Sequence, residues 1–154
     1  MLEIIVASER DLAAIKGLFK EYAMSLDFDL SFQNFERELD RLPGEYAPPR
    51  GALLLAKYGI EVAGCVALRE LTEGFCEMKR LYVRPPFRGR SIGRKLAESV
   101  IENARTVGYR GMKLDTVSSM KEAISLYKSL GFREIGTYRF NPLKDAVYME
   151  LTLS

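Results

Sequence analysis

Residues 77–94 read EMKRLYVRPPFRGRSIGR, and this stretch decides both the expected fold and the expected chemistry. The apolar residues up to Val83 predict the end of a strand, because Pro85 and Pro86 cannot donate hydrogen bonds to a sheet. The glycines and arginines that follow predict a turn and then the N-terminus of a helix. Unpaired backbone N–H groups and the helix dipole converge at such a turn, so the stretch predicts an anion-binding site.

Three arginines of the turn favour phosphate as the anion. Arg88, Arg90 and Arg94 supply positive charge and guanidinium groups that bind phosphate through paired hydrogen bonds. Other phosphate loops fit less well. A Walker A loop needs a Gly-Lys-Ser/Thr ending, and a dinucleotide fingerprint needs its first glycine directly after the strand, where residues 84–88 intervene. On spacing alone, a basic helix start with solvated arginines is an alternative interpretation.

The composition narrows the chemistry further. The chain has 154 residues, 47% hydrophobic and 29% charged, which is typical of one soluble globular domain over residues 1–154. It has no histidine, which excludes Ser-His-Asp and Cys-His catalytic groups and histidine-ligated zinc or haem. A general base must therefore be a carboxylate, a tyrosine, a lysine, a thiol or a relayed water.

Cysteine usage and charge indicate the compartment and the partners. Cys65 and Cys76 lie in apolar, strand-like runs and are expected to be buried free thiols of a reducing cytosol. No Cys-rich spacing predicts a metal site. The first residues lack a signal-peptide pattern, no apolar run approaches the roughly 18 residues of a spanning helix, and the net charge is only +2. We therefore expect a cytoplasmic protein with no metal, nucleic-acid or membrane partner.

Hydrophobic periodicity on both sides of the central stretch predicts a mixed α/β domain. Ser8, followed three positions later by Asp11, resembles a capping box that opens the first helix, and Ser31 is the expected start of a second helix that Pro43 ends. Short turns predict an antiparallel meander over residues 52–83. The expected strands cover residues 3–7, 52–58, 61–71, 75–83, 112–117, 132–135 and 146–153, and the later helices cover residues 92–107 and 120–130.

The central stretch resembles the GNAT N-acetyltransferase superfamily. Residues 88–93 match the family pattern Arg/Gln-x-x-Gly-x-Gly/Ala, which cradles the pyrophosphate of acetyl-coenzyme A (acetyl-CoA), and the preceding Leu-x-Val-x-Pro of residues 81–85 is similar too. A second motif, Ala-x-x-Leu-Tyr-x-x-x-Gly-Phe at residues 123–132, follows at the expected separation. The resemblance covers about residues 52–151. It implies a mixed, centrally splayed β-sheet flanked by α-helices, with acetyl-CoA as co-substrate.

Two positions depart from the family pattern. Ser91 stands where the central glycine is usual, and its backbone N–H can still serve the loop if φ at this residue stays negative. Met120 stands where many members carry an asparagine that contacts the cofactor or orders the loop.

The resemblance also implies roles for particular residues. In the family, the strand before the loop splays from its neighbour and frees backbone N–H groups for the pantetheine and the thioester. Tyr127 matches the tyrosine that donates a proton to the coenzyme A sulfur, and the alternative for this residue is a tyrosine packed in the core. The implied cofactor-binding residues are Leu81, Tyr82, Val83, Arg88, Gly89, Arg90, Ser91, Ile92, Gly93, Arg94 and Tyr127.

Glu77 is the candidate general base. Some relatives, notably histone acetyltransferases, carry their general-base glutamate at this strand position. Strand alternation places Glu77 on the face of Lys79, Leu81 and Val83, from which it would take the amine proton directly or through water. The alternative is an exposed or salt-bridged strand glutamate.

The acceptor side is less well defined. In relatives, the region between the first two helices and the last hairpin shapes the acceptor pocket, where acidic residues could attract an ammonium and Arg139 could hold a carboxylate. A solvated helix face is the alternative for each charged residue. These parts of the chain carry Asp27, Asp29, Glu36, Glu38, Tyr46, Tyr138 and Arg139.

The sequence therefore predicts an N-acetyltransferase that transfers acetyl to a primary amine of a small molecule or peptide, directly and in a ternary complex. A homodimer is compatible with this interpretation. Two other functions stay open. One is a catalytically degenerate domain that binds an acyl-CoA as a sensor. The other is a nucleic-acid or anion-binding module that uses Arg80, Arg84, Arg88, Arg90 and Arg94.

Overall fold

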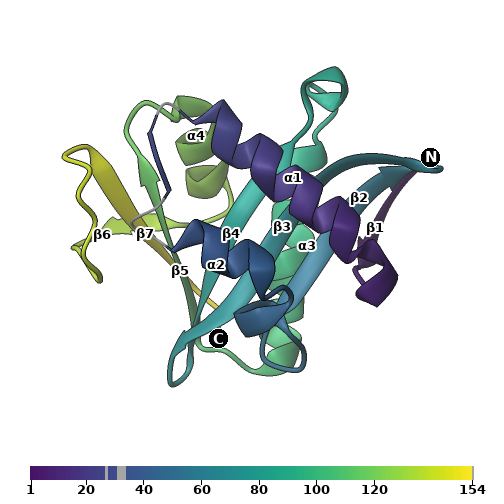
Figure 1. Ribbon diagram of the computed structural model, residues 1–154. Helices are drawn as coiled ribbons and strands as arrows, with labels where there is room; N and C mark the ends of the chain where they lie inside the picture. Colours follow the sequence, from purple (N-terminus) through teal and green to yellow (C-terminus); the bar gives the residue numbers. More distant parts are fainter. Residues whose placement is uncertain (27, 31–33, 154) are drawn as a thin grey trace.

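The structure is a computed structural model that describes residues 1–26, 28–30 and 34–153. Its centre is a seven-stranded mixed sheet in the order β1-β2-β3-β4-β5-β7-β6 (Figure 1). The strands are β1 (Leu2–Val6), β2 (Ala52–Tyr58), β3 (Glu61–Thr72), β4 (Phe75–Val83), β5 (Gly111–Val117), β6 (Arg133–Ile135) and β7 (Ala146–Thr152). The helices are α1 (Leu12–Ser25), α2 (Phe35–Asp40), α3 (Ile92–Val107) and α4 (Lys121–Ser129), with 3-10 turns η1 (Glu9–Asp11), η3 (Gly44–Tyr46) and η4 (Pro85–Phe87).

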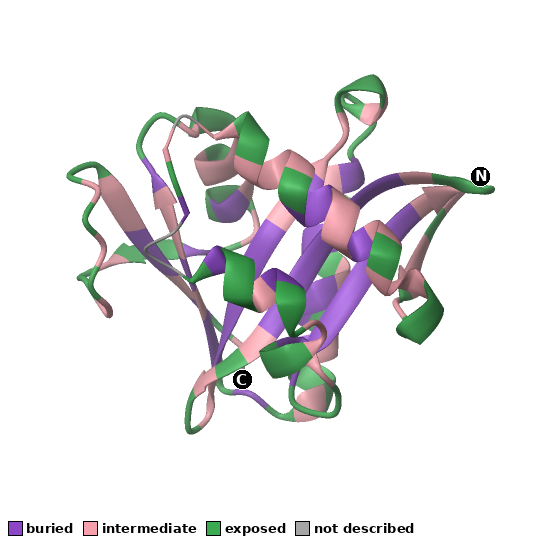
Figure 2. Cartoon of the chain, viewed as in Figure 1, coloured by how far each residue is buried: buried purple, intermediate pink, exposed green. Residues whose placement is uncertain are grey.

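Helices cover both faces of the sheet. α1 and α2 lie over one face, where Ile15 and Phe19 join Leu53 and Leu55 of β2 in one buried cluster (Figure 1). α3 and α4 lie over the other face, whose cluster includes Leu54. Because alternate residues of β2 point to opposite faces, this strand contributes to both cores, and Figure 2 shows the buried centre of the sheet beneath α1 and α2. Among the described residues, no helix has both the length and the apolar character of a membrane-spanning segment.

Most of the predicted elements are confirmed. They include the antiparallel meander of β2, β3 and β4, and helix α3 over its predicted residues. The capping box is also present, with the Ser8 N–H donating to the Asp11 carboxylate at 2.8 Å, although it opens the 3-10 turn η1 before α1 begins. The predicted helix start at Ser31 lies outside the described residues, as does Asp27. Helix α2 begins at Phe35, after its N-cap Asn34.

Both cysteines are buried free thiols, as the sequence predicts. The Cys65 thiol donates to the Arg80 carbonyl at 3.4 Å, and the Cys76 thiol donates to the Gly111 carbonyl at 3.5 Å. Burial raises the pKa of Cys65, and it raises the pKa of Cys76 to about 12. Both sulfurs are therefore held in the protonated, unreactive form inside the sheet.

The strands β4 and β5 separate at the centre of the sheet. Their parallel pairing covers only residues 75–77 against residues 111–113, although β4 continues to Val83 and β5 to Val117. β5 pairs with β7 along its whole length instead. The sheet is therefore splayed, which confirms the fold expected from the resemblance, and the end of β4 presents backbone groups to a gap rather than to a neighbouring strand.

A β-bulge in β4 lies beside this gap. Tyr82 pairs with Cys65, whereas Lys79 pairs with Ala67, so β4 carries one residue more than β3 between these two pairs. Arg80 lies in this interval with a φ of 61°, a left-handed conformation that is uncommon for any residue other than glycine.

The bulge makes one expectation about β4 wrong. Simple alternation puts Glu77 on the same face as Leu81 and Val83. In the structure, Leu81 and Val83 pack against the core under α3 and α4, whereas Glu77 bonds to Arg69 on the opposite face, where η3 lies. The extra residue shifts the alternation by one position, so the candidate base and the end of the strand face opposite sides of the sheet.

Candidate active site

A run of unpaired backbone donors lies between β4 and α3. None of the six N–H groups of residues 89–94 donates a hydrogen bond to another described residue. Gly89 has a φ of 81° and Ser91 a φ of 61°, so both lie in the left-handed region. Successive amides in such a turn, together with the positive end of the α3 dipole, form a concavity that can hold a phosphate.

The three arginines of the turn are spread around it. Arg88 Nε donates to the carbonyl of Val83 at 2.9 Å, which fixes this side chain beside the end of β4. Arg90 lies over two aromatic rings at 5.6 and 5.8 Å from their centroids and keeps its guanidinium exposed. Arg94 reaches α4, where it donates to Ser129 Oγ at 2.6 Å. The turn is therefore positively charged on both sides.

The other two arginines of the region are used differently. Arg80 is buried and makes two hydrogen bonds of 2.9 Å to the carboxylate of Glu38 on α2. Arg84 pairs with Glu21 of α1 at 2.7 Å. The nucleic-acid interpretation requires a continuous basic surface made by five arginines. Two of the five, Arg80 and Arg84, are neutralised by carboxylates, so the positive surface is smaller than that interpretation needs.

Ser91 does not have the negative φ that the sequence analysis set as a condition for serine in this loop. Its φ of 61° and ψ of 22° are left-handed, a conformation that glycine adopts at little cost. For a residue with a Cβ, that region costs roughly 1 kcal/mol or more. Ser91 is the N-cap of α3, but its side chain makes no capping hydrogen bond that would offset this cost.

Ser91→Gly is therefore expected to raise the free energy of unfolding by about 1 kcal/mol. Ser99→Gly, the same chemical change inside α3, is the matched control, and it is expected to lower the free energy of unfolding by about 0.5 kcal/mol because glycine is a poor helix former. Chemical denaturation of the two variants measures both signs. Equal losses in both variants would contradict a strained serine in the loop.

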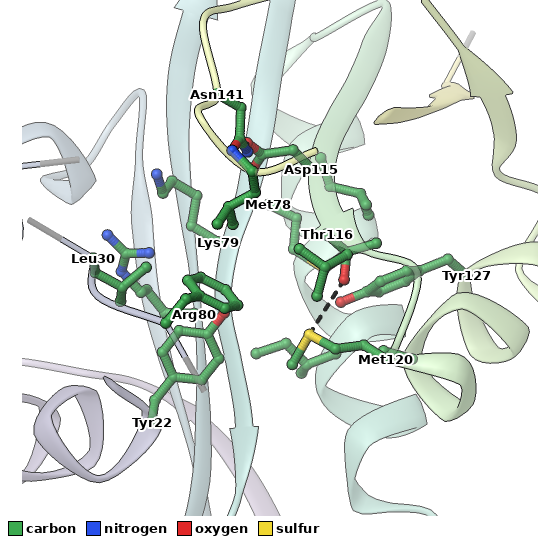
Figure 3. A pocket seen from close by; sticks show the side chains of 16 residues that line it. Tyr22, Leu30, Met78, Lys79, Arg80, Asp115, Thr116, Met120, Tyr127 and Asn141 are labelled. Atoms are coloured by element: carbon green, nitrogen blue, oxygen red, sulfur yellow. Dashed lines mark hydrogen bonds between the residues drawn. The ribbon is translucent and has the colours of Figure 1, made fainter. Parts of the chain in front are cut away.

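A hollow of about 90 Å³ occupies the gap between β4 and β5 (Figure 3). Residues 78–81 of β4 form one wall and residues 114–117 of β5 form the other. The splay thus creates a space that a paired sheet would not have. The lining is completed by Tyr22, Phe28, Leu30, Met120, Ala123, Tyr127, Asn141 and Leu143.

Tyr127 stands at one side of this hollow. Its hydroxyl end points toward Thr116 and Met120, which are themselves joined by a 3.3 Å hydrogen bond from the Thr116 hydroxyl to the Met120 sulfur (Figure 3). Its ring belongs to the core and lies 5.7 Å from the ring of Phe132. Burial raises the pKa of Tyr127, so the phenol keeps its proton throughout the physiological range. The residue therefore has a packed ring and a hydroxyl directed into the hollow.

The last amides of β4 point in alternating directions. The Arg84 N–H donates to the Ala63 carbonyl on β3 at 2.8 Å. Because hydrogen-bonding directions alternate along a strand, the N–H of Tyr82 points to β3 as well, whereas those of Leu81 and Val83 point into the gap. Of these two, Leu81 lines the hollow, whereas Val83 lies beyond the residues that form its wall.

Glu77 is fully buried at the paired end of β4. Its carboxylate accepts hydrogen bonds from Arg69 Nε at 2.8 Å and from the Tyr138 hydroxyl at 2.6 Å, and it forms an ion pair with Arg139. Arg69 also pairs with Glu45 at 2.7 Å. The salt-bridged interpretation of Glu77 thus describes the carboxylate without substrate.

Sequence reasoning missed the polar groups on the walls of the gap. Lys79 is buried there, and its burial, together with the positive charges of Arg80 and Arg69, lowers its pKa to about 7. On the β5 side, the Asn141 amide donates to Asp115 at 3.3 Å. No local pattern signals these positions, because the splay and the bulge bring them together.

A larger hollow of about 530 Å³ gathers three of the residues predicted for the acceptor side, namely Glu38, Tyr46 and Arg139. It lies on the face of the sheet that α1 and α2 cover, beside the buried Glu77. Asp29 and Glu36 are exposed and line neither of these two hollows.

A splayed mixed sheet with an open amide turn beside the gap is the architecture expected of an acyltransferase that uses a coenzyme A thioester. The family model described as Acetyltransferase (GNAT) family matches residues 15–132, and the chain belongs to this family. It is therefore an acyltransferase.

Several known proteins are similar to this chain over nearly its whole length. An uncharacterised N-acetyltransferase of Schizosaccharomyces pombe is 41% identical over 148 residues, which cover 94% of this chain and 90% of that protein. An acetyltransferase of the GNAT family from Staphylococcus aureus Mu50 shares the fold with a TM-score of 0.81 and 22% identity over all of both chains. The structure of yncA from Salmonella typhimurium with its cofactor acetyl-CoA has a TM-score of 0.75 and 23% identity, and the match covers 99% of this chain and 94% of that one.

Proposed function

We propose that the protein transfers the acetyl group of acetyl-CoA to a primary amine of a small molecule or peptide, directly and in a ternary complex. The observation that carries the proposal is the run of six unpartnered amides at residues 89–94, directly beside the gap in the sheet. An open amide turn supports phosphate binding, and a gap that leads from it to a protonated phenol supports thioester chemistry.

The residues of the turn fit a pyrophosphate. A Cβ placed on Gly89 would meet no atom within 4 Å, so there is open space beside the turn. The amides of residues 89–94 would bind the phosphate oxygens, and the exposed guanidiniums of Arg88 and Arg90 would offset their charge. A structural neighbour that holds acetyl-CoA supports the same ligand for this chain.

Acetyl-CoA supplies an acetyl group already activated as a thioester. The Leu81 and Val83 amides would donate hydrogen bonds to the carbonyl oxygen and the pantetheine arm. The amine nitrogen forms its bond to the carbonyl carbon as the carbon–sulfur bond breaks. Tyr127 would then give its phenolic proton to the departing sulfur, a role for which a protonated phenol beside the gap is suited.

Glu77 is the proposed final acceptor of the amine proton. Because its carboxylate is buried and already bonded, we propose that the proton reaches it through Tyr138, whose hydroxyl donates to Glu77 at 2.6 Å. In this relay the Tyr138 oxygen takes a proton from the amine as its own proton passes to Glu77. The phenol is neutral before and after the step.

Direct transfer is supported by the state of the thiols. A route through an acetylated enzyme needs an accessible nucleophile, usually a thiolate. The chain has two cysteines, and both are fully buried and protonated. Neither lines the two hollows described above.

Two measurements test the proposal together. Thermal denaturation with acetyl-CoA at a hundredfold excess over its Kd should show stabilisation by about 2.7 kcal/mol. Release of the free coenzyme A thiol in the presence of a panel of amines should then show turnover. No thermal shift would exclude acetyl-CoA as the ligand, and a shift without thiol release from any amine would instead support the sensor function.

A further inference from the structure

The hollow of about 530 Å³ beside Glu77 has an unusual charge pattern. Its size lies within the range of pockets for small molecules. Its walls come from α2, η3, β3 and the segment that joins β6 to β7, so parts distant in the sequence build it. Its charged lining residues are Arg37, Glu38, Arg41, Glu45, Arg69 and Arg139.

Positive charge exceeds negative charge around this hollow. The carboxylates of Glu38 and Glu45 are each bonded to an arginine, Glu38 to Arg80 and Glu45 to Arg69. The lining has four arginines and two glutamates, and adding the buried Glu77 and Arg80, the partner of Glu38, gives five arginines and three glutamates. Two positive charges are therefore in excess. Arg37 and Arg41 on and after α2 are exposed and form no ion pair within the described residues.

The guanidinium group of Arg139 lacks a hydrogen-bond acceptor within the described part of the chain. One of its terminal nitrogens pairs with Glu77, but its Nε is buried and has no hydrogen-bond partner among the described residues. A buried guanidinium N–H without an acceptor is costly, because it has lost water without gaining a partner. The side chain is only 20% exposed and lies on the wall of the hollow, so a ligand oxygen placed there would meet this need.

The hollow adjoins the proposed reaction centre. Glu38 lines the larger hollow, and its partner Arg80 lines the gap between β4 and β5, so the two members of one ion pair border the two spaces. Arg139 contacts Glu77, the proposed proton acceptor, and follows Tyr138 in the chain. A ligand in the larger hollow would therefore be close to the groups that handle the amine proton.

From these observations we infer that the acceptor is an amine that also carries a carboxylate, and that Arg139, Arg37 and Arg41 bind the carboxylate. Guanidinium groups bind carboxylates through paired, charge-assisted hydrogen bonds. An excess of positive charge disfavours a polyamine, whose several ammonium groups would be repelled. The inference rests on the proposed acetyl transfer and names the class of its acceptor.

Matched pairs of amines provide the test. Each pair combines an amino acid with its carboxamide, which has the same amine and nearly the same shape but no negative charge; β-alanine with β-alaninamide and the α-amino acids with their amides cover different spacings. Thiol release is measured for both members, with spermidine and O-phosphoethanolamine as further arms. We expect at least one pair in which kcat/KM for the carboxylate exceeds that for the amide about tenfold or more, as for loss of one charge-assisted contact.

Variants locate the carboxylate site. Arg37→Gln combined with Arg41→Gln should raise KM for the preferred carboxylate about tenfold and leave kcat and the KM for acetyl-CoA unchanged. Arg139→Lys should also raise this KM, because lysine cannot replace the fork of the guanidinium. Arg105→Gln on α3, on the opposite face of the sheet, removes one positive charge and is the control, with unchanged KM.

Each outcome decides one question. Equal turnover of carboxylates and amides, preference for spermidine, or preference for O-phosphoethanolamine over every carboxylate would each overturn the inference while acetyl transfer stands. Thermal stabilisation by acetyl-CoA without turnover of any pair would also overturn it. Absence of that stabilisation would refute the proposed function itself, independently of the acceptor.

Discussion

Tyr127→Phe is expected to lower kcat about 100-fold and to leave KM for acetyl-CoA nearly unchanged, since proton transfer by a placed acid contributes about 10²–10⁴-fold. The substitution removes only the hydroxyl that points into the gap, and the ring that packs beside Phe132 stays. Steady-state thiol release with a saturating amine measures both constants. Turnover within twofold of the unmodified protein would contradict the acid role.

Tyr109→Phe is the matched control for this variant. Its hydroxyl donates to the Arg50 carbonyl at 2.7 Å, away from both hollows, so its loss removes one hydrogen bond without touching the proposed chemistry. We expect kcat to be unchanged and the free energy of unfolding to fall by about 1 kcal/mol.

Because burial raises the pKa of Tyr127, the phenol should also remain protonated as the pH rises to 9, and kcat should show no basic limb from this residue below that pH.

The turn and the helix that follow β4 could be predicted because their signals are local. Pro85 and Pro86 end the strand, Gly89 permits a left-handed φ of 81°, and the apolar stripe of α3 repeats with the helical period. The splay could be expected only through the family resemblance. No residue in β4 or β5 indicates locally that the pairing of these strands stops after three residue pairs.

The bulge could not be predicted, and this error placed Glu77 on the wrong face. Its left-handed residue is Arg80, an amino acid that gives no local sign of such a conformation, and its side chain is held by Glu38, which is 42 residues away. The loop shows a similar limit, because the positive φ of Ser91 is imposed by the path of the chain into α3 and not by the residue itself.

The residues that contact Glu77 could not be predicted from the sequence either. Arg69 reaches it through the register of β3 and β4, and Tyr138 and Arg139 reach it from the segment between β6 and β7, which is 61 residues further along at Tyr138. The only charged neighbour that strand alternation placed on the face of Glu77 was Lys79. A carboxylate surrounded by distant donors has a role that only the tertiary structure can specify.

Two different losses are expected from Glu77→Gln. The side chain keeps its size but loses its charge, which leaves Arg69 and Arg139 without their shared carboxylate. Removing one partner of a buried ion pair costs about 3–5 kcal/mol, so the free energy of unfolding should fall by a similar amount. Glu98→Gln, on the exposed surface of α3, is the matched control, with an expected change within about 0.5 kcal/mol.

The catalytic effect of Glu77→Gln is separable from this loss of stability. If Glu77 accepts the amine proton, its replacement should lower kcat about 100-fold and remove the acidic limb of the pH–rate profile, where protonation of the carboxylate blocks the base. Tyr138→Phe should reproduce the fall in kcat, because it breaks the proposed relay at its 2.6 Å hydrogen bond, while both charged partners of Glu77 remain. Rates are measured at a temperature where circular dichroism shows each variant folded. An acidic limb that persists in folded Glu77→Gln would assign the proton to bulk water and leave Glu77 as the residue that positions Arg139.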